Sequence, residues 1–307
     1  MVKIAVLASF NMDLVMRAER RPQDGETLQG EFAMFLGGKG FNQAVAARRL
    51  GANVCVAGRV GDDEFGRLFL DALDREGIDR RGVVVVAAAG TGVASIIVEP
   101  DGKNTILQAP RANRNVSAED VQGAAEMLAG ASFGMLQIET STQGAIAFAR
   151  AMRASGSRTL LNPAPAAPVD RELLALIDVI VPNQIEAEAL TSKKVRTLEE
   201  AFEAAHALRN LGPSAAVITL GERGAVGLSA DALVHEPPCD VPVVDTVGAG
   251  DAFCAAVAVR MAEGAPLADA LRFANAAGAL ACTKRGAEPS MPRRDEIEAL
   301  IAKGVVS

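Results

Sequence analysis

Short apolar runs alternate with helical segments along most of this chain of 307 residues, and no other feature constrains its fold as strongly. The segment 41–50 is helix-like and is followed by Gly51, while 64–76 carries its apolar residues on one helical face and is followed by Gly77. Glycine readily adopts the left-handed conformation that ends many helices. The apolar runs that we interpret as buried strands are 4–8, 54–57, 135–138, 159–161, 179–181 and 216–219. This order predicts a doubly wound α/β fold, in which a mostly parallel sheet has helices on both faces.

Two stretches interrupt the alternation. Residues 19–35 are extended and polar, with no helical period. Residues 91–108 read as two strands around Pro100-Asp101-Gly102-Lys103, which is a strong turn signal. Together these stretches are expected to form a small separate β-sheet. No linker, internal repeat or low-complexity tract divides the sequence, so we expect a single domain over 1–307 with this sheet as an appendage.

The charge of the chain excludes some classes of partner. Its 31 basic and 38 acidic residues give a formal charge of −7, whereas nucleic acids and anionic membranes require a basic surface. No apolar run approaches the roughly 18 residues of a membrane span, and the apolar run 4–8 is too short for the core of a secretion signal. The four cysteines form no Cys-x-x-Cys pair. We therefore expect a cytoplasmic protein with no nucleic-acid or membrane partner.

The run Gly248-Ala249-Gly250-Asp251 is the strongest functional signal in the sequence. It lies between an apolar segment, 241–244, which we interpret as a strand, and the apolar helical run 252–261. The first N–H groups of a helix lack partners within the helix and the helix dipole adds positive potential, so glycines here can form a cradle for a phosphate group. A carboxylate beside such a cradle suits a general base that accepts a proton from an attacking hydroxyl. The alternative is that Asp251 only caps its helix.

A second glycine cluster, Gly37-Gly38-Lys39-Gly40-Phe41-Asn42, leads into the helix-like segment 41–50. Lys39 and Asn42 would offer a cation and a two-way hydrogen-bonding group to a polyhydroxylated ligand. Asn11 and Asp13 follow the first strand, at the carboxyl edge where open parallel sheets bind ligands. The alternative for each of these residues is ordinary turn chemistry. Neither glycine cluster completes a dinucleotide fingerprint or a Walker-type loop.

These motifs occur together in a known family. Gly37-Gly38-Lys39-Gly40-Phe41-Asn42-Gln43-Ala44, with Leu50-Gly51 and Val60-Gly61-Asp62-Asp63, resembles one signature of the ribokinase-like, or phosphofructokinase-B, carbohydrate kinases. Asp245-Thr246-Val247-Gly248-Ala249-Gly250-Asp251-Ala252-Phe253 resembles the other. Further matching segments lie at 11–13, 136–139, 162–166, 183–186, 219–221 and 284–290, so the resemblance covers nearly the whole chain in order. It implies a doubly wound α/β domain with a β-sheet lid, at approximately 14–35 and 90–110, and a homodimer that forms through this lid.

The resemblance also implies a role for each candidate residue. Asp251 would be the catalytic base, with the backbone N–H groups of Gly248, Ala249 and Gly250 at the transferring phosphoryl group. The sugar would be bound by Asn11, Asp13, Gly38, Lys39, Asn42, Glu139 and Asp251. ATP would be bound by Asn183, Thr219, Gly221, Gly224, Gly250 and Asn275, and Mg²⁺ by Glu186 and Asn183. A monovalent cation, K⁺, would lie among Asp245, Val247, Ala281, Lys284, Gly286 and Ser290.

The activity that the resemblance implies is ATP-dependent phosphorylation of D-ribose to ribose 5-phosphate. Another sugar or nucleoside kinase of the family, acting on deoxyribose, fructose or adenosine, is one alternative. A non-catalytic sugar sensor is the alternative from a different class. Phe41 and Asn275 depart from the family pattern, in which a small residue and sometimes His stand at these positions. Phe41 would either crowd the sugar pocket or pack beneath its helix.

Overall fold

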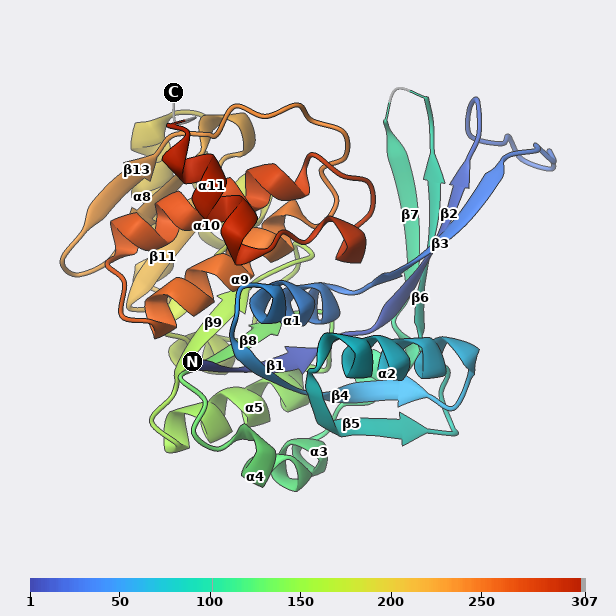
Figure 1. The fold of residues 1–307 in the computed structure, drawn as a ribbon, viewed down its shortest axis with the longest axis horizontal. Helices are drawn as coiled ribbons and strands as arrows, with labels where there is room; N and C mark the ends of the chain where they lie inside the picture. The colour runs from blue at the N-terminus through green and yellow to red at the C-terminus, as the bar shows by residue number, and fades with distance from the viewer. Residues whose placement is uncertain (101, 305–307) are drawn as a thin grey trace.

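The computed structural model describes residues 1–100 and 102–304, and a large β-sheet forms its centre (Figure 1). In this part of the chain nine strands make up the sheet. In order across it they are β13 (Leu233–Glu236), β12 (Ala225–Leu228), β11 (Ala215–Thr219), β10 (Val179–Ile180), β9 (Arg158–Asn162), β8 (Phe133–Gln137), β1 (Lys3–Ala8), β4 (Asn53–Gly61) and β5 (Asp79–Val86). All neighbours from β11 to β5 are parallel, and β12 and β13 are antiparallel. The predicted fold class is confirmed.

Helices cover both faces of this sheet. One face carries α1 (Lys39–Arg49), α2 (Glu64–Glu76), α9 (Ala249–Ala262), α10 (Leu267–Ala281) and α11 (Arg294–Ala302). The other carries α3 (Ala118–Gly123), α4 (Ala125–Leu128), α5 (Thr142–Ala154), α6 (Arg171–Ala175), α7 (Gln184–Thr191) and α8 (Leu198–Arg209). Short 3-10 turns lie at η1 (Arg111–Asn115), η2 (Gly221–Arg223) and η3 (Glu288–Ser290). None of the helices in the described residues has the length and apolar character needed to cross a membrane.

The two hydrophobic cores are separated by the central strand β1. Ile4, Val6 and Ala8 face the core beneath α1 and α9, while Ala5 and Leu7 face the core beneath α5. All five side chains are fully buried. A parallel strand between two helical layers needs apolar residues at every position, which is why this run shows no polar alternation.

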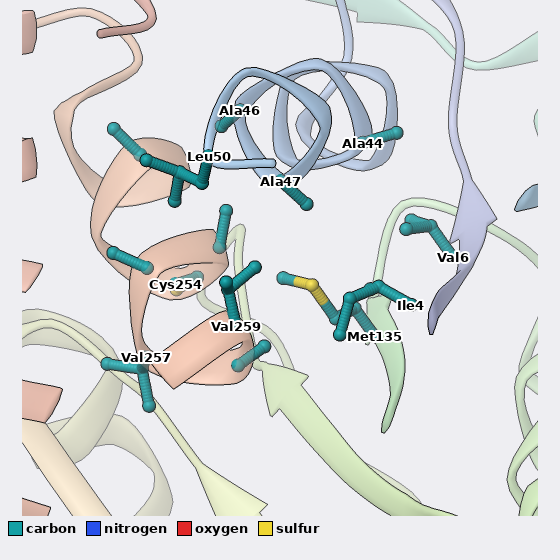
Figure 2. Close-up of a cluster of buried hydrophobic side chains, with 14 of the residues drawn as sticks. Ile4, Val6, Ala44, Ala46, Ala47, Leu50, Met135, Cys254, Val257 and Val259 are labelled. Carbon is teal, nitrogen blue, oxygen red and sulfur yellow. The ribbon is translucent and has the colours of Figure 1, made fainter. Parts of the chain in front are cut away.

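Helix α9 lies within the first core and is apolar on nearly every side. Figure 2 shows α1, which carries Ala46 and Ala47, next to α9, which carries Cys254 and Val259, with Met135 of β8 near Val259. Small side chains let two helices approach closely. This packing places the first turn of α1 next to the first turn of α9, although about 200 residues separate them in the sequence.

A second, four-stranded sheet extends from one side of the larger one (Figure 1). In order, its strands in the described chain are β3 (Glu31–Gly37), β2 (Asn11–Arg17), β6 (Gly92–Val98) and β7 (Asn104–Ala109). β3 contains residues 31–35 of the first interrupting stretch, and β6 and β7 contain most of the second, so the predicted small sheet is confirmed, whereas residues 19–30 form no strand. The first strand of this small sheet, β2, begins at Asn11, only two residues after β1 of the larger sheet ends at Ala8. Asp101 of the expected turn lies outside the described residues.

One strand prediction is wrong. Residues 241–244 form no strand, and the side chains of Val243 and Val244 are 66% and 55% exposed. Their backbone is anchored instead to the end of α10, where Val244 N donates to Cys282 O at 2.8 Å. An apolar run becomes a strand only where a neighbouring strand can pair with it, and none in the described chain pairs with this segment.

Candidate active site

A cavity of about 1380 Å³ opens between the carboxyl ends of the parallel strands and the small sheet. The larger sheet contributes residues at or just beyond the ends of its strands, among them Glu139, Asn162 and Thr219. Most of the predicted site residues line this one cavity: Asn11, Asp13, Gly38, Lys39, Asn42, Glu139, Asn183, Glu186, Thr219, Asp245, Val247, Gly248, Gly250, Asp251 and Gly286.

Helix α9 begins at the wall of this cavity. Gly248 is its N-cap residue, with a φ of 82° that favours glycine, and a Cβ there would lie 2.7 Å from Met291 Cε. Gly250 faces open space instead, so it leaves room for a ligand rather than for a protein neighbour. Within the described chain the N–H groups of Gly248 and Gly250 donate to no acceptor, whereas Ala249 N donates to Thr246 O at 3.3 Å. Free amides at the start of a 14-residue helix suit an anion.

Asp251 does not cap α9, and the capping alternative is therefore wrong. Its Oδ2 accepts a hydrogen bond from Asn42 Nδ2, and its Oδ1 accepts one from Gln43 Nε2, each at 3.0 Å. Burial raises the pKa of Asp251 above its ordinary value, against the opposing effects of Lys39 and the two amide donors. A buried carboxylate with a raised pKa in a cavity is typical of acid–base chemistry.

The Glu139 carboxylate joins three parts of the site. Its Oε2 accepts hydrogen bonds from Ser9 Oγ at 2.6 Å and from Lys39 N at 2.9 Å. Its Oε1 accepts one from Gln108 Nε2 of the small sheet at 3.2 Å. Glu139 thus connects the start of α1 with the end of β1 and with β7.

Two buried amide atoms on the cavity wall have no partner in the described residues. Asn11 accepts from Asn113 Nδ2 at 3.0 Å, which leaves Asn11 Nδ2 without an acceptor. Asn42 donates to Asp251, which leaves Asn42 Oδ1 without a donor. Because a buried polar atom without a partner costs free energy, a free donor and a free acceptor here fit a ligand that carries hydroxyl groups.

The charges around these amides are strongly coupled. Burial, together with the charges of Glu139 and Asp251, raises the pKa of Asp13 to about 7, although Lys39 acts in the opposite direction. Burial would lower the pKa of Lys39, but Asp251, Glu139 and Glu186 outweigh it, so that its pKa is raised. Lys39 is therefore a buried cation shared among several carboxylates.

Asn183 and Glu186 form a capping box at the start of α7. Glu186 N donates to Asn183 Oδ1 at 2.9 Å, and Asn183 N donates to Glu186 Oε2 at 2.8 Å. Glu186 is nevertheless buried against the cavity, and burial raises its pKa. Its Oε1 accepts no hydrogen bond in the described chain, so one oxygen remains available to an ion. Helix capping and ion binding are compatible here.

Three residues expected at the nucleotide lie apart from this cavity. Asn275 Nδ2 donates to Glu236 O at 3.0 Å and to Pro237 O at 2.9 Å. A Cβ at Gly224 would lie 2.0 Å from Glu236 O, so this glycine lets the same backbone approach closely. Gly221 opens η2, three residues before Gly224. The three residues therefore gather around the segment that follows β13, beside Thr219 at the end of β11.

Asp245 organises the loop where the monovalent cation was expected. Its Oδ2 accepts from Gly286 N at 3.0 Å and its Oδ1 from Val247 N at 3.1 Å. The Lys284 side chain turns away to Glu296 at 3.1 Å, and Ser290 Oγ donates to Ala287 O at 2.8 Å. No cluster of three or more His, Cys, Asp or Glu able to hold a metal occurs in residues 1–100 and 102–304. A cation here would thus depend on backbone carbonyls such as those of Ala281 and Lys284, which is what the resemblance implies.

Several buried polar residues at the site had no predicted role. Gln43, Gln137 and Asn162 form hydrogen bonds behind Asp251, and Asn113 holds Asn11. All but Asn113 stand in segments that match the family, and the signals that could have suggested a role are the strand ends at Gln137 and Asn162 and the first helical turns at Gln43. Phe41, by contrast, does not line the cavity. It is fully buried beneath its helix, with its ring centroid 5.0 Å from that of Phe69.

Known proteins share this architecture and these motifs. The sequence pattern of the pfkB family carbohydrate kinase matches residues 1–294. The chain is 37% identical over 295 residues to a ribokinase of Haemophilus influenzae, which covers 95% of this chain and 96% of that protein. It is 36% identical over 291 residues to a deoxyribokinase of Salmonella typhi, which covers 94% of this chain and 95% of that protein. The solved structure of Arabidopsis thaliana ribokinase complexed with ribose and ATP has a TM-score of 0.90 and 32% identity, covering 98% of this chain and 99% of that chain. The chain therefore belongs to the pfkB family of carbohydrate kinases.

Proposed function

We propose that this carbohydrate kinase transfers the γ-phosphoryl group of ATP to the 5-hydroxyl of D-ribose, giving ribose 5-phosphate and ADP. The position of Asp251 carries the proposal. Its buried carboxylate lies in the first turn of α9, where the N–H groups of Gly248 and Gly250 have no acceptor among the described residues. The same cavity holds the free amide atoms of Asn11 and Asn42. A sugar hydroxyl and a phosphate chain can therefore meet at one carboxylate.

The sugar would be bound by six residues besides the base: Asn11, Asp13, Gly38, Lys39, Asn42 and Glu139. The free donor of Asn11 and the free acceptor of Asn42 support this assignment, because each needs a partner that the described chain does not supply. Asp13 and Glu139 would accept hydrogen bonds from hydroxyls, and Lys39 would balance part of their charge. The Arabidopsis ribokinase, whose structure is similar, binds ribose and ATP.

In the proposed step Asp251 accepts the proton of the 5-hydroxyl while that oxygen forms a bond to the γ-phosphorus. The bond from this phosphorus to the β,γ-bridging oxygen breaks, and ADP leaves with the electron pair. The N–H groups of Gly248 and Gly250 would donate to the transferring phosphoryl oxygens. Ala249 would join them once its N–H releases Thr246 O.

ATP would be bound by Asn183, Thr219, Gly221, Gly224, Gly250 and Asn275. Glu186 with Asn183 would hold Mg²⁺, and the free Oε1 of Glu186 fits an ion that keeps several of its waters. Mg²⁺ offsets negative charge on the phosphates when it is bound. Potassium would lie among Asp245, Val247, Ala281, Lys284, Gly286 and Ser290. Equal turnover in potassium and tetramethylammonium salts would remove this part of the proposal.

The small sheet would act as a lid, at approximately 14–35 and 90–110, and also as the contact between two subunits of a homodimer. Its strand register supports both roles. The side of β2 that carries Asn11 and Asp13 lines the cavity. The opposite side aligns Met16 with Phe32 and Leu14 with Met34, and the side chains of Phe32 and Met34 are 58% and 49% exposed. An exposed apolar sheet face of this kind is typical of a surface that a partner covers.

The test is a coupled assay of ADP release with ribose, deoxyribose, fructose and adenosine, each with and without potassium. Ribose should give the highest kcat/KM, and the phosphorylated position can be read by phosphorus–proton NMR. A higher kcat/KM for deoxyribose would replace ribose in the proposal, and this outcome has support because the deoxyribokinase is almost as similar as the ribokinase. Sugar binding without turnover under every cation condition would instead indicate a sensor.

A further inference from the structure

A chain of buried side-chain amides connects Asp251 with the ends of β8 and β9. Gln43 Nε2 donates to Asp251 Oδ1 at 3.0 Å and to Asn162 Oδ1 at 3.2 Å. Gln137 Nε2 donates to Gln43 Oε1 at 2.7 Å. Asn162 Nδ2 donates to the Val181 carbonyl at 2.9 Å. Gln43 and Gln137 are buried, and neither of them lines the cavity.

The direction of these hydrogen bonds follows from their fixed ends. The carbonyl oxygen of Val181 can only accept, so Asn162 must present its NH₂ group to Val181 and its oxygen to Gln43. Gln137 presents its NH₂ group to the oxygen of Gln43 from the other side. Both N–H bonds of Gln43 are therefore directed, one at Asn162 and the other at Asp251. If the nitrogen and oxygen of the Gln43 amide exchanged places, the Gln43 oxygen would face the oxygens of Asn162 and Asp251, and both hydrogen bonds would be lost.

The two oxygens of Asp251 consequently have different surroundings. Oδ1 is bound by Gln43, which is excluded from the cavity. Oδ2 is bound by Asn42, which lines the cavity and whose carbonyl oxygen has no donor in the described part of the chain. We propose that Gln43, oriented by Asn162 and Gln137, is a positioning residue that keeps Asp251 ionised and turns Oδ2 toward the acceptor hydroxyl. This inference rests on the proposed role of Asp251 as the general base.

The charges that face Asp251 make such a donor necessary. Lys39 from α1 is cationic, whereas Asp13 from β2, Glu139 beyond β8 and Glu186 from α7 are acidic. Cys254, one turn along α9, is fully buried beside it, and burial raises the pKa of its thiol. Burial and the acidic neighbours favour the protonated form of Asp251, while Lys39, Asn42 and Gln43 favour the ionised form. Loss of the Gln43 donor should therefore raise the pKa of Asp251 further, so that the base becomes ionised only at higher pH.

The test compares Gln43→Met with the wild-type enzyme across pH 5.5–9.5, using the sugar that the wild type phosphorylates best. Methionine has nearly the length of glutamine and no donor. We expect kcat/KM to fall about tenfold at pH 6 and to recover to within about threefold of wild type at pH 9. KM for the sugar should change less than kcat, because Gln43 does not line the cavity.

Two further variants separate positioning from packing. Gln43→Glu keeps the shape but places an acid against Asp251, so its loss at pH 6 should exceed that of Gln43→Met. Gln137→Met removes one of the two groups that orient Gln43 and leaves the donor to Asp251 in place, so it should give a smaller change in the same direction. Gln108→Met is the matched control, because Gln108 donates to Glu139 and not to Asp251. It should alter sugar KM without moving the acidic limb of the profile.

A uniform loss of activity at all pH values in Gln43→Met, with an acidic limb like that of wild type, would overturn the inference. A Gln43→Glu enzyme with an unchanged acidic limb would do the same, and thermal melting identifies any variant that fails to fold. Carboxyl ¹³C shifts of Asp251, compared with the wild-type protein across the same pH range, provide a readout that does not need turnover. If the wild type phosphorylates no sugar in the panel, the proposed function fails by itself, and the ¹³C titration still decides whether Gln43 keeps Asp251 ionised.

Discussion

At the scale of single residues, four carboxylates surround the buried ammonium group of Lys39: Asp13, Glu139, Glu186 and Asp251. One cation cannot compensate this much negative charge in a poorly solvated cavity. Burial is the largest cause of the raised pKa values of Asp13, Glu186 and Asp251, and the charges of neighbouring carboxylates raise them further. A sugar and a magnesium ion would relieve this repulsion by adding hydrogen-bond donors and positive charge. Free and loaded protein should therefore bind protons differently.

Asp251→Asn tests the base directly. Asparagine keeps the size of the side chain and can still bond Asn42 or Gln43 after its amide turns, but it cannot accept a proton. We expect kcat to fall by roughly 10²- to 10⁴-fold, with sugar affinity changed much less. Steady-state kinetics gives the first quantity and isothermal calorimetry the second. Near-normal turnover would refute the assignment.

Asp13 should couple stability to pH. Its pKa is raised from 3.8 to about 7, so between these values the folded state binds a proton that the unfolded state has lost. The free energy of unfolding should therefore fall as the pH rises from about 4 to 7. Asp13→Asn removes this effect. It should melt at a higher temperature than wild type at pH 8, with the difference disappearing toward pH 4, and it should bind ribose less tightly.

Melting curves at several pH values provide the measurement. Asp24→Asn is the matched control, since Asp24 is exposed outside the cavity, and its curves should follow wild type throughout. A destabilised Asp13→Asn protein at pH 8 would contradict the interpretation.

At the scale of elements, a helix or strand could be predicted from the sequence where its residues contact one another. Prediction failed where the element depends on contacts with distant segments. Helix α2 occupies its predicted residues because its signals lie within it: the Asp63 side chain accepts from Gly66 N, and Gly77 adopts a φ of 66°. The wrong strand at 241–244, the unpredicted edge strands β5 and β13 and the unpredicted strand β12 depend on pairing with other segments. The neighbouring glycines Gly248 and Gly250 likewise identified Asp251 as a candidate site residue from the sequence. The contact that excludes a cap comes from Gln43, 208 residues away, and no local pattern shows it.

Arg49 connects two elements that support the site. From the end of α1 its Nη1 donates to the carbonyls of Glu288 and Met291, at 2.7 and 3.2 Å, and its Nη2 pairs with Glu76 at 2.6 Å. Met291 in turn packs against Gly248. Arg49→Met should lower the free energy of unfolding by about 2 kcal/mol, because it leaves partly buried carbonyls and the carboxylates of Glu76 and Glu288 without their partner.

Urea unfolding measures this loss. Arg67→Met is the matched control, since Arg67 forms its ion pair with Glu64 on the surface with 60% of its side chain exposed. That variant should lose less than about 1 kcal/mol. If both variants lost the same free energy of unfolding, the contacts of Arg49 would stabilise the protein no more than a surface ion pair does.

At the scale of the whole molecule, the outer face of the small sheet carries several exposed apolar side chains. Leu107 on β7 is 78% exposed and is aligned through Ser95 with Leu14 of β2. If two subunits meet there, Leu107→Asp should shift sedimentation from dimer to monomer at micromolar concentration. Leu233→Asp, at a site 60% exposed on the far edge of the larger sheet, should leave the dimer unchanged. A monomeric wild-type protein would remove the proposed dimer.

Strand β2 serves both faces of the small sheet by simple alternation, with Asn11 and Asp13 toward the cavity and Leu14 and Met16 away from it. A shift of one residue along this strand would therefore exchange the side chains of the two faces, and a shift of two would not. Deletion of one residue after Asn11 would place Leu14 in the sugar site and Asp13 on the outer surface. Deletion of two residues would return the remaining side chains to their original faces. Length changes in this strand should therefore be tolerated during evolution only in even steps or where a bulge absorbs them.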